Sequence, residues 1–156
     1  MNALDRNLLG LLQVDNQLSL DELAEHAGSS RSVVHRRLRD LRGGGYIRAD
    51  VSILDPNVVG DLQTFVLQLS VRQENSKLLD TFIDSVSELP QVQQCYLTTG
   101  SANCVVVLLL EDAEALDRFV AHHFTDDPFV CRFRSNLVTR NVKLGLTLPL
   151  NNEKDR

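Results

Sequence analysis

Residues 29–42 constrain the fold most, because they combine a narrow apolar stripe with a wide cationic surface. At about 100° per residue, Val34, Leu38 and Leu41 align along one side of a helix. The remaining surface carries polar and basic side chains, namely Arg31, Ser32, His35, Arg36, Arg39 and Arg42. Such a helix can bury only one edge, so it must pack within a small helical unit and leave its other side in solvent.

The charge of this helix is opposite to that of the whole chain. The chain has 156 residues and a formal net charge of −5, whereas residues 30–48 contain six arginines and one acid, Asp40. A charged helix surface often does no more than face solvent. A cationic surface on an acidic protein, however, also attracts polyanions. Double-stranded DNA is the commonest polyanion for a helix of this shape.

The residues before this helix predict a helix-turn-helix. A first amphipathic helix is marked by Leu4, Leu8, Leu9, Leu11 and Leu12. Ser19 followed by Glu22 has the spacing of a capping box, which predicts the start of a second helix, and Gly28 predicts its end. Ser29 or Ser30 is then expected to cap the basic helix. The turn between the second and third helices is only a few residues long, as in helix-turn-helix proteins.

The three glycines at 43–45 are expected to end the basic helix, and the alternation in residues 46–54 predicts a strand or β wing. Asp55-Pro56 to Gly60 interrupt the pattern and mark a boundary. The predicted organisation is a winged helix-turn-helix domain with a linker strand over 1–60, a second domain over 61–150, and a polar tail over 151–156.

The second domain alternates between strand and helix periods. Strands are predicted at 62–72, 92–99, 104–110 and 129–144, and helices at 78–89 and 113–124. The order β-α-β-β-α-β predicts a ferredoxin-like α+β domain, in which both helices cover one face of an antiparallel sheet.

The third predicted strand is apolar at every position from Cys104 to Leu110, so both of its faces must avoid water. One face meets the helices, and the other is expected to meet a second copy in a two-fold dimer. Val105, Val107 and Leu109 share one side, and Val106 and Leu108 the other. The sequence does not decide which side forms the interface, and a central strand packed by local side chains is the alternative.

The remaining reactive residues predict no catalytic site, metal site or cofactor. The three cysteines lack the close C-x-x-C spacing of zinc or redox sites. The adjacent His122 and His123 do not have the i, i+4 spacing by which a helix presents two histidines to one metal. The longest apolar run is too short to cross a bilayer, and no signal peptide precedes Asp5. We therefore expect a cytoplasmic protein that does not contact a membrane.

Together the two halves resemble the leucine-responsive/asparagine-responsive (Lrp/AsnC, feast-famine) family of bacterial and archaeal regulators. The resemblance extends from Leu4 to Leu150 and depends on the order and spacing of several short motifs. These are Leu4-Asp5-Arg6, Leu20-x-x-Leu23-Ala24, Gly28-x-Ser30, Arg37-Leu38-x-x-Leu41, Gly45-Tyr46-Ile47, Leu54-Asp55-Pro56 and Leu89-Pro90-x-Val92. It implies a winged helix-turn-helix joined to a βαββαβ ligand-sensing domain, with dimers that assemble into tetramers or octamers. It also implies promoter DNA and, frequently, an amino-acid effector as partners.

The start of a recognition helix usually meets base edges, while flanking cations hold phosphates. We expect contacts near bases from Ser30, Arg31, Ser32, His35 and Arg36, with Arg39 and Arg42 nearer the backbone. Arg37 is included in the same DNA-binding set.

The resemblance places an effector pocket at the turn between the second and third strands, where the family usually carries Gly-Asp-Tyr-Asp. This chain has Gly100-Ser101-Ala102-Asn103 instead. A neutral amide binds an ammonium group more weakly than a carboxylate does, so common amino acids are expected to bind weakly or not at all. The expected ligand-binding residues are Thr98, Gly100, Ser101, Ala102, Asn103, Ser135 and Asn136.

The sequence leaves two alternatives open. The chain is either a regulator that responds to a ligand, or an architectural DNA-binding protein that acts by oligomerisation alone. An enzyme on the βαββαβ domain with a vestigial winged helix is disfavoured, because the basic helix is intact and no catalytic cluster is evident.

Overall fold

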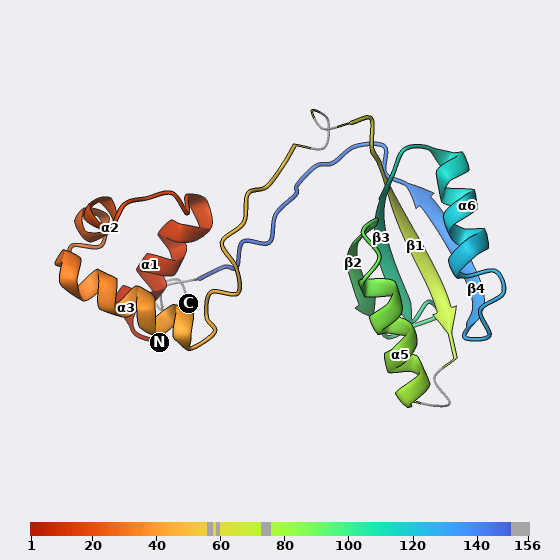
Figure 1. Ribbon diagram of the computed structural model, residues 1–156, viewed down its shortest axis with the longest axis horizontal. Coiled ribbons are helices and arrows are strands. Elements are labelled where there is room, and N and C mark those ends of the chain that lie inside the picture. The colour runs from red at the N-terminus through yellow and green to blue at the C-terminus, as the bar shows by residue number, and fades with distance from the viewer. Residues whose placement is uncertain (56–57, 59, 73–75, 151–156) are drawn as a thin grey trace. The chain divides into compact units, whose positions relative to one another are not determined.

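The computed structural model describes residues 1–55, 58, 60–72 and 76–150 (Figure 1). The chain divides into two compact units. The first contains Met1–Ile53 together with the chain from Lys143 onward, and the second contains Leu54–Val142. The predicted tail at 151–156, and Pro56 within the predicted boundary, lie outside the described residues.

The first unit contains the three predicted helices, α1 (Ala3–Val14), α2 (Leu20–His26) and α3 (Arg31–Gly43). They share a small core in which the buried side chains are Leu8, Leu23, Ala24, Val34 and Leu38. The C-terminal segment joins this unit, since the Gln13 side chain accepts a hydrogen bond from Leu148 N at 2.6 Å.

Local sequence signals fix the helix ends. The Ser19 hydroxyl accepts from Glu22 N, and the Glu22 carboxylate accepts from Ser19 N at 2.8 Å, which confirms the predicted capping box. Gly28 has a φ of 59° at the end of α2, and Gly45 has a φ of 72° just beyond α3. A side chain is strained in this left-handed region, so glycine is suited to both positions.

The second unit contains a four-stranded sheet and two helices in the predicted order. The elements are β1 (Gln63–Val71), α5 (Ser76–Ser87), β2 (Val92–Leu97), β3 (Cys104–Leu110), α6 (Ala113–His123) and β4 (Val130–Leu137). The strands lie in the order β2-β3-β1-β4, and all neighbours are antiparallel. The βαββαβ ferredoxin-like prediction is therefore confirmed.

The wing predicted at residues 46–54 is wrong: this segment is described throughout and contains no strand. Its apolar side chains are largely exposed, and Ile53 is 91% exposed. A strand needs a neighbour to pair its backbone groups, and in this chain the segment pairs with no strand among the described residues. An alternating apolar sequence is therefore not enough to form a strand at residues 46–54.

The last strand is also shorter than the predicted 129–144. β4 pairs with β1 from Val130 to Leu137, where Leu137 lies opposite Phe65. Val138 N still donates to Thr64 O at 2.9 Å, but β1 begins at Gln63. β4 therefore ends close to the residue at which its partner strand β1 begins.

Alternation along β3 shows which side of the sheet the helices cover. Cys104, Val106, Leu108 and Leu110 are buried, whereas the residues between them are only partly buried. The buried set packs with Phe82 of α5 and with Phe119 of α6 and Phe124 just beyond it in one core. The other side of the sheet, here called the open face, carries Val66, Gln68, Ser70, Gln94, Tyr96, Val105, Val107, Leu109, Arg132, Arg134 and Asn136.

Candidate functional sites

The exposed side of α3 has the polar and basic character that the sequence predicts. Val34, Leu38 and Leu41 are buried against the first unit. The opposite surface is exposed and consists of Arg31, Ser32, His35, Arg36, Arg39 and Arg42. The structure therefore brings these predicted DNA-binding residues together on one solvent-facing surface.

The N-terminus of α3 is suited to an anion. Ser30 occupies the N-cap position, but its hydroxyl lies 3.2 Å from the Ser32 hydroxyl and does not cap the helix. The first N–H groups of a helix carry partial positive charge and attract phosphate. A shallow hollow at this end is lined by Leu20, Ser30, Arg31, Ser32 and His35.

The exposed arginines of α3 make only weak ion pairs. Arg31 lies 3.0 Å from Asp21, and both side chains are more than half exposed. Arg42 lies 3.3 Å from Asp50, and both of these side chains are nearly half exposed. Exposed pairs of this kind contribute about 0–1 kcal/mol, so a phosphate can replace the acid.

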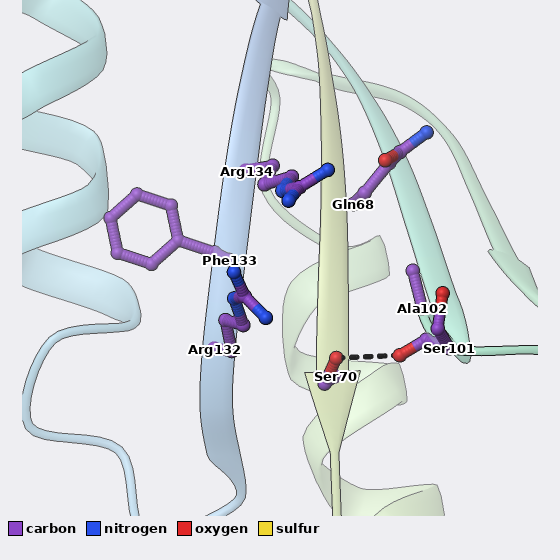
Figure 2. Close-up of a pocket in the computed structure, with 7 residues that line it drawn as sticks. All are labelled: Gln68, Ser70, Ser101, Ala102, Arg132, Phe133 and Arg134. Atoms are coloured by element: carbon purple, nitrogen blue, oxygen red, sulfur yellow. Dashed lines mark hydrogen bonds between the residues drawn. The ribbon is translucent and has the colours of Figure 1, made fainter.

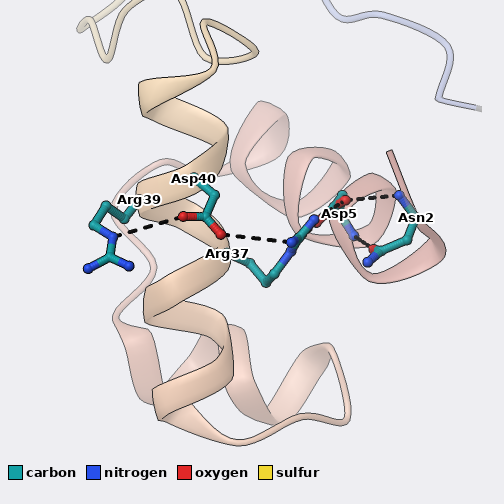
Figure 3. A network of polar contacts seen from close by, with 5 residues as sticks. All are labelled: Asn2, Asp5, Arg37, Arg39 and Asp40. Carbon is teal, nitrogen blue, oxygen red and sulfur yellow. Dashed lines mark hydrogen bonds and ion pairs between the residues drawn. The ribbon is translucent and has the colours of Figure 1, made fainter.

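Arg37 is placed differently from the other arginines of α3 (Figure 3). Its Nε donates to Asp5 Oδ1 at 2.8 Å, and its Nη2 donates to Asp5 Oδ2 at 2.6 Å. Asp5 is only 1% exposed and also accepts from Asn2 N at 2.9 Å, as part of the capping box of α1. The guanidinium of Arg37 thus ties α3 to the first turn of α1.

This contact also sets the protonation of Asp5. Hydrogen bonds from Arg37 lower the pKa of the Asp5 carboxyl below its ordinary value, although burial acts in the opposite direction. The sequence placed Arg37 in the DNA-binding set without distinguishing it from the other arginines of this helix. Its hydrogen-bond partner, Asp5, is 32 residues away in the sequence, so only the structure shows that Arg37 differs from the exposed arginines.

Several polar side chains of the loop between β2 and β3 already form hydrogen bonds with the backbone. The Thr98 hydroxyl donates to Ala102 O at 2.8 Å, and Gly100 has a φ of 125°. Asn103 Nδ2 donates to Val71 O at 2.8 Å, and Asn103 Oδ1 accepts from Val71 N at 2.7 Å. The Asn103 carboxamide therefore holds the end of β1 rather than facing a ligand.

The other two predicted ligand residues lie apart from this loop. Ser135 is opposite Leu67 and so belongs to the helix-covered side of the sheet. Asn136 is opposite Val66 on the open face, where its Nδ2 donates to Val66 O at 3.4 Å. The structure brings Ser101 and Ala102 to a common hollow, but it does not bring Ser135 there.

That hollow has a volume of about 120 Å³ on the open face (Figure 2). It is lined by Gln68, Ser70, Ser101, Ala102, Arg132, Phe133 and Arg134. Figure 2 shows the side chains of Arg132 and Arg134 reaching from β4 toward β1, while the Phe133 ring points away. Neither arginine was among the residues predicted from the sequence, although the alternation Arg-Phe-Arg in a strand places both on one face.

Two of the cysteines are neighbours on the helix-covered side of the sheet. Cys95 lies opposite Val106, and Cys104 lies opposite Leu97 in the same strand pair. A hydrogen bond from the Cys104 thiol lowers the pKa of Cys95 to about 7, whereas the Cys95 sulfur and burial raise the pKa of Cys104. Among the described residues, no three side chains gather in a way that could hold a metal ion. No described helix has the length and apolar character needed to cross a membrane.

Comparisons with known proteins cover both units. Residues 1–42 match the AsnC-type helix-turn-helix domain, and residues 64–148 match the Lrp/AsnC ligand binding domain. The chain belongs to the Lrp/AsnC family of transcriptional regulators. This membership confirms the resemblance inferred from the sequence motifs.

Individual relatives match along nearly their whole length. An HTH-type transcriptional regulator of Sinorhizobium fredii is 31% identical over 150 residues, which cover 96% of this chain and 89% of the relative. The crystal structure of an AsnC family regulator from Agrobacterium tumefaciens has a TM-score of 0.89 at 28% identity, and covers 96% of this chain and 97% of that one. A regulator of Neisseria meningitidis, solved in complex with L-Met, has a TM-score of 0.88 at 28% identity, with 97% of each chain covered.

Proposed function

We propose that this Lrp/AsnC regulator binds double-stranded DNA in the cytoplasm through the exposed side of α3. The observation that supports this most is the division of α3 into a buried apolar stripe and an exposed cationic surface. The proposed contact residues are Ser30, Arg31, Ser32, His35, Arg36, Arg39 and Arg42. Arg37 is proposed instead to hold α3 against α1.

A double variant tests this assignment. Arg36→Ala together with Arg39→Ala removes one expected base contact and one expected phosphate contact. The operator, found first by genomic footprinting, should bind the variant far more weakly in a mobility-shift titration. The double variant Arg140→Ala with Lys143→Ala removes two exposed positive charges beyond β4 and serves as a charge-matched control. Equal affinity of the double variant and the wild type would show that α3 is not the recognition helix.

The open face supports a second part of the proposal, a two-fold dimer. Val105, Val107 and Leu109 form a partly exposed apolar row in the centre of the sheet, and Tyr96 beside them is 48% exposed. A second copy of the same face is the most economical cover for such a row. Two linked recognition helices would also bind two half-sites with higher effective concentration. Tetramers or octamers would be built from this dimer.

We further propose that the second unit senses a small molecule. The Neisseria meningitidis relative was solved with L-Met, which shows that this fold can hold an amino acid. In this chain, the Asn103 side chain forms two hydrogen bonds with the Val71 backbone. The turn between β2 and β3 also lacks the two acids that could neutralise an ammonium group. We therefore propose that common amino acids bind only at millimolar concentrations or above. Micromolar binding of any of the twenty in calorimetry would refute this.

A further inference from the structure

The pairing of β2 with β3 brings two cysteines together under the helices. Cys95 lies opposite Val106, and Cys104 lies opposite Leu97, so the two cysteines are diagonal neighbours on the same side of the sheet. Their thiols are close enough for a hydrogen bond from Cys104 to Cys95. The sequence separates the two residues by a whole loop, and only the strand register shows that they meet.

The hydrogen-bond pattern of these strands favours a close approach of the two side chains. Thr98 N donates to Asn103 O at 2.9 Å at the end of the strand pair. Hydrogen-bonded and non-hydrogen-bonded pairs alternate along antiparallel strands. The pairs that contain Cys95 and Cys104 are therefore of the non-hydrogen-bonded kind, in which opposing side chains are closer.

The two thiols differ in exposure and in acidity. Cys104 is fully buried, whereas Cys95 is partly exposed and lies in β2, an edge strand of the sheet. The hydrogen bond from Cys104 lowers the pKa of Cys95 to about 7, so much of Cys95 is thiolate at neutral pH. A partly exposed thiolate beside a second thiol is the arrangement of redox-sensing cysteines. Both residues lie on the helix-covered side, so a second copy on the open face does not cover them.

We propose that Cys95 and Cys104 form a reversible disulfide in response to a hydroperoxide. The Cys95 thiolate attacks the peroxide O–O bond and becomes a sulfenic acid, while the other oxygen takes up a proton and leaves as an alcohol or as water. The Cys104 thiol then attacks the Cys95 sulfur, and the S–O bond breaks as water leaves with the Cys104 proton. The two cysteines lose two electrons, which the peroxide gains. A small thiol reverses the reaction by exchange with the disulfide.

The third cysteine cannot take part in this bond. Cys131 is exposed, but it lies in β4, at the opposite edge of the sheet from β2. Paired strands are about 4.8 Å apart, so three spacings place Cys131 about 14 Å from Cys95. Cys131 is therefore an internal control for reactivity that comes from exposure alone.

The bond should also change the open face. Diagonal neighbours on paired strands have Cα atoms about 7–8 Å apart, whereas those joined by a disulfide usually lie about 4.4–6.8 Å apart. Bond formation therefore draws Cys95 toward Cys104 and slides β2 along β3. Tyr96 and Val105 lie opposite each other on the open face beside this bond, so they move with the strands. Oxidation should weaken the two-fold dimer, a consequence that rests on the proposed function.

Peptide mapping of the full chain tests the bond itself. The reduced protein is treated with a tenfold excess of hydrogen peroxide, alkylated, and cleaved with chymotrypsin, which cuts after Tyr96 and so between the two cysteines. We expect the fragments that contain Cys95 and Cys104 to remain joined and to separate on treatment with dithiothreitol. The variant Cys131→Ser should form the same bond.

Two further variants test the order of the steps. Cys104→Ala removes the second thiol, so Cys95 should persist as a sulfenic acid that dimedone labels. Cys95→Ala should leave Cys104 reduced, because the remaining thiol is buried. The melting temperature of each reduced variant reports whether the fold is intact, and the mapping of the wild type needs neither variant.

Sedimentation velocity tests the effect on assembly. In the Cys131→Ser background, which excludes bonds between copies through this exposed thiol, oxidation should raise the dimer dissociation constant at least tenfold. Dithiothreitol should restore the original value. The matched control adds Cys95→Ala to the same background, and peroxide should leave its dimer unchanged.

The possible failures are distinct. Absence of the Cys95–Cys104 bond in the peroxide-treated wild type, or dimedone labelling of Cys131 but not of Cys95 in Cys104→Ala, would overturn the proposal. A bond that forms without weakening the dimer would overturn the proposed movement of the open face. A reduced protein that sediments as a monomer would instead contradict the proposed dimer, and the mapping would still decide whether the disulfide forms.

Discussion

At the scale of single residues, the Asp5–Arg37 pair shows how one contact can serve two elements. Asp5 closes the first turn of α1 and, with the same carboxylate, holds the guanidinium of α3. A buried carboxylate is costly unless it is paired and hydrogen-bonded, and here both of its oxygens are used. The orientation of α3, and so of its exposed arginines, depends on this contact.

Replacement of Asp5 by alanine should destabilise the first unit by about 3 kcal/mol, because it removes a cap and leaves Arg37 without its partner. The measurement is chemical denaturation monitored by circular dichroism. The double variant Asp5→Leu with Arg37→Met should recover much of the loss, since an apolar pair can replace a buried ion pair. If Arg37 instead contacted DNA, this refolded double variant would lose operator binding.

The same pair predicts a pH dependence. Because the pKa of Asp5 is lowered in the folded state from its ordinary value of 3.8, the pair contributes fully above that pH. Its contribution is lost as the pH falls through the lower folded-state pKa. The difference in unfolding free energy between wild type and Asp5→Asn should therefore be constant near neutrality and shrink below about pH 4. A difference that stayed constant down to pH 2 would exclude this linkage.

Single substitutions in α3 should separate base contacts from phosphate contacts. Arg36→Ala should cost about 1–3 kcal/mol on the operator and relax sequence preference, if Arg36 forms a bidentate contact with guanine. Arg39→Ala should weaken all sequences alike and reduce the slope of log affinity against log salt by about one. Titrations of specific and random DNA at several salt concentrations measure both effects, and identical behaviour of the two variants would contradict the division.

At the scale of elements, the sequence predicted those features that are fixed by neighbours in the chain. The capping box of Ser19 and Glu22 and the alternation along β1 depend on local geometry alone, and the structure has them where expected. The wing at 46–54 and the far end of β4 depend on a partner strand. The apolar alternation in both segments was real, but no strand of this chain lies beside it among the described residues.

The exposed surface of α3 and the hollow on the open face also differ in how far each could be predicted from the sequence. The polar surface of α3 follows from helical periodicity, so its residues could be named from the sequence. The hollow on the open face depends on the pairing of β1 with β4, which brings Arg132 opposite Ser70. The sequence pointed to Ser101 and Ala102 through a family motif, but it could not show that Asn103 is held by Val71.

The role of Asn103 leads to a prediction for the loop that joins β2 and β3. Asn103→Asp keeps the shape of the side chain but cannot donate to Val71 O, so it should destabilise the second unit by about 1–3 kcal/mol. It should not create a tight amino-acid site, because the new carboxylate remains beside β1. Denaturation and calorimetry with amino acids measure these two results. Micromolar amino-acid binding by a stable Asp variant would show that the side chain faces a ligand after all.

At the scale of the whole molecule, the open face decides whether two copies act together. Val106 and Val107 are adjacent in β3, but Val106 is fully buried under the helices and Val107 is on the open face. Val106→Asp should prevent folding, because the charge would lie unpaired in the core. Val107→Asp should preserve the helical and strand signals in circular dichroism while abolishing the dimer in sedimentation velocity. Its affinity for a two-half-site operator should then fall toward that of one half-site, because the gain from effective concentration is lost. A folded Val107→Asp protein that sediments as a dimer would move the interface to another surface.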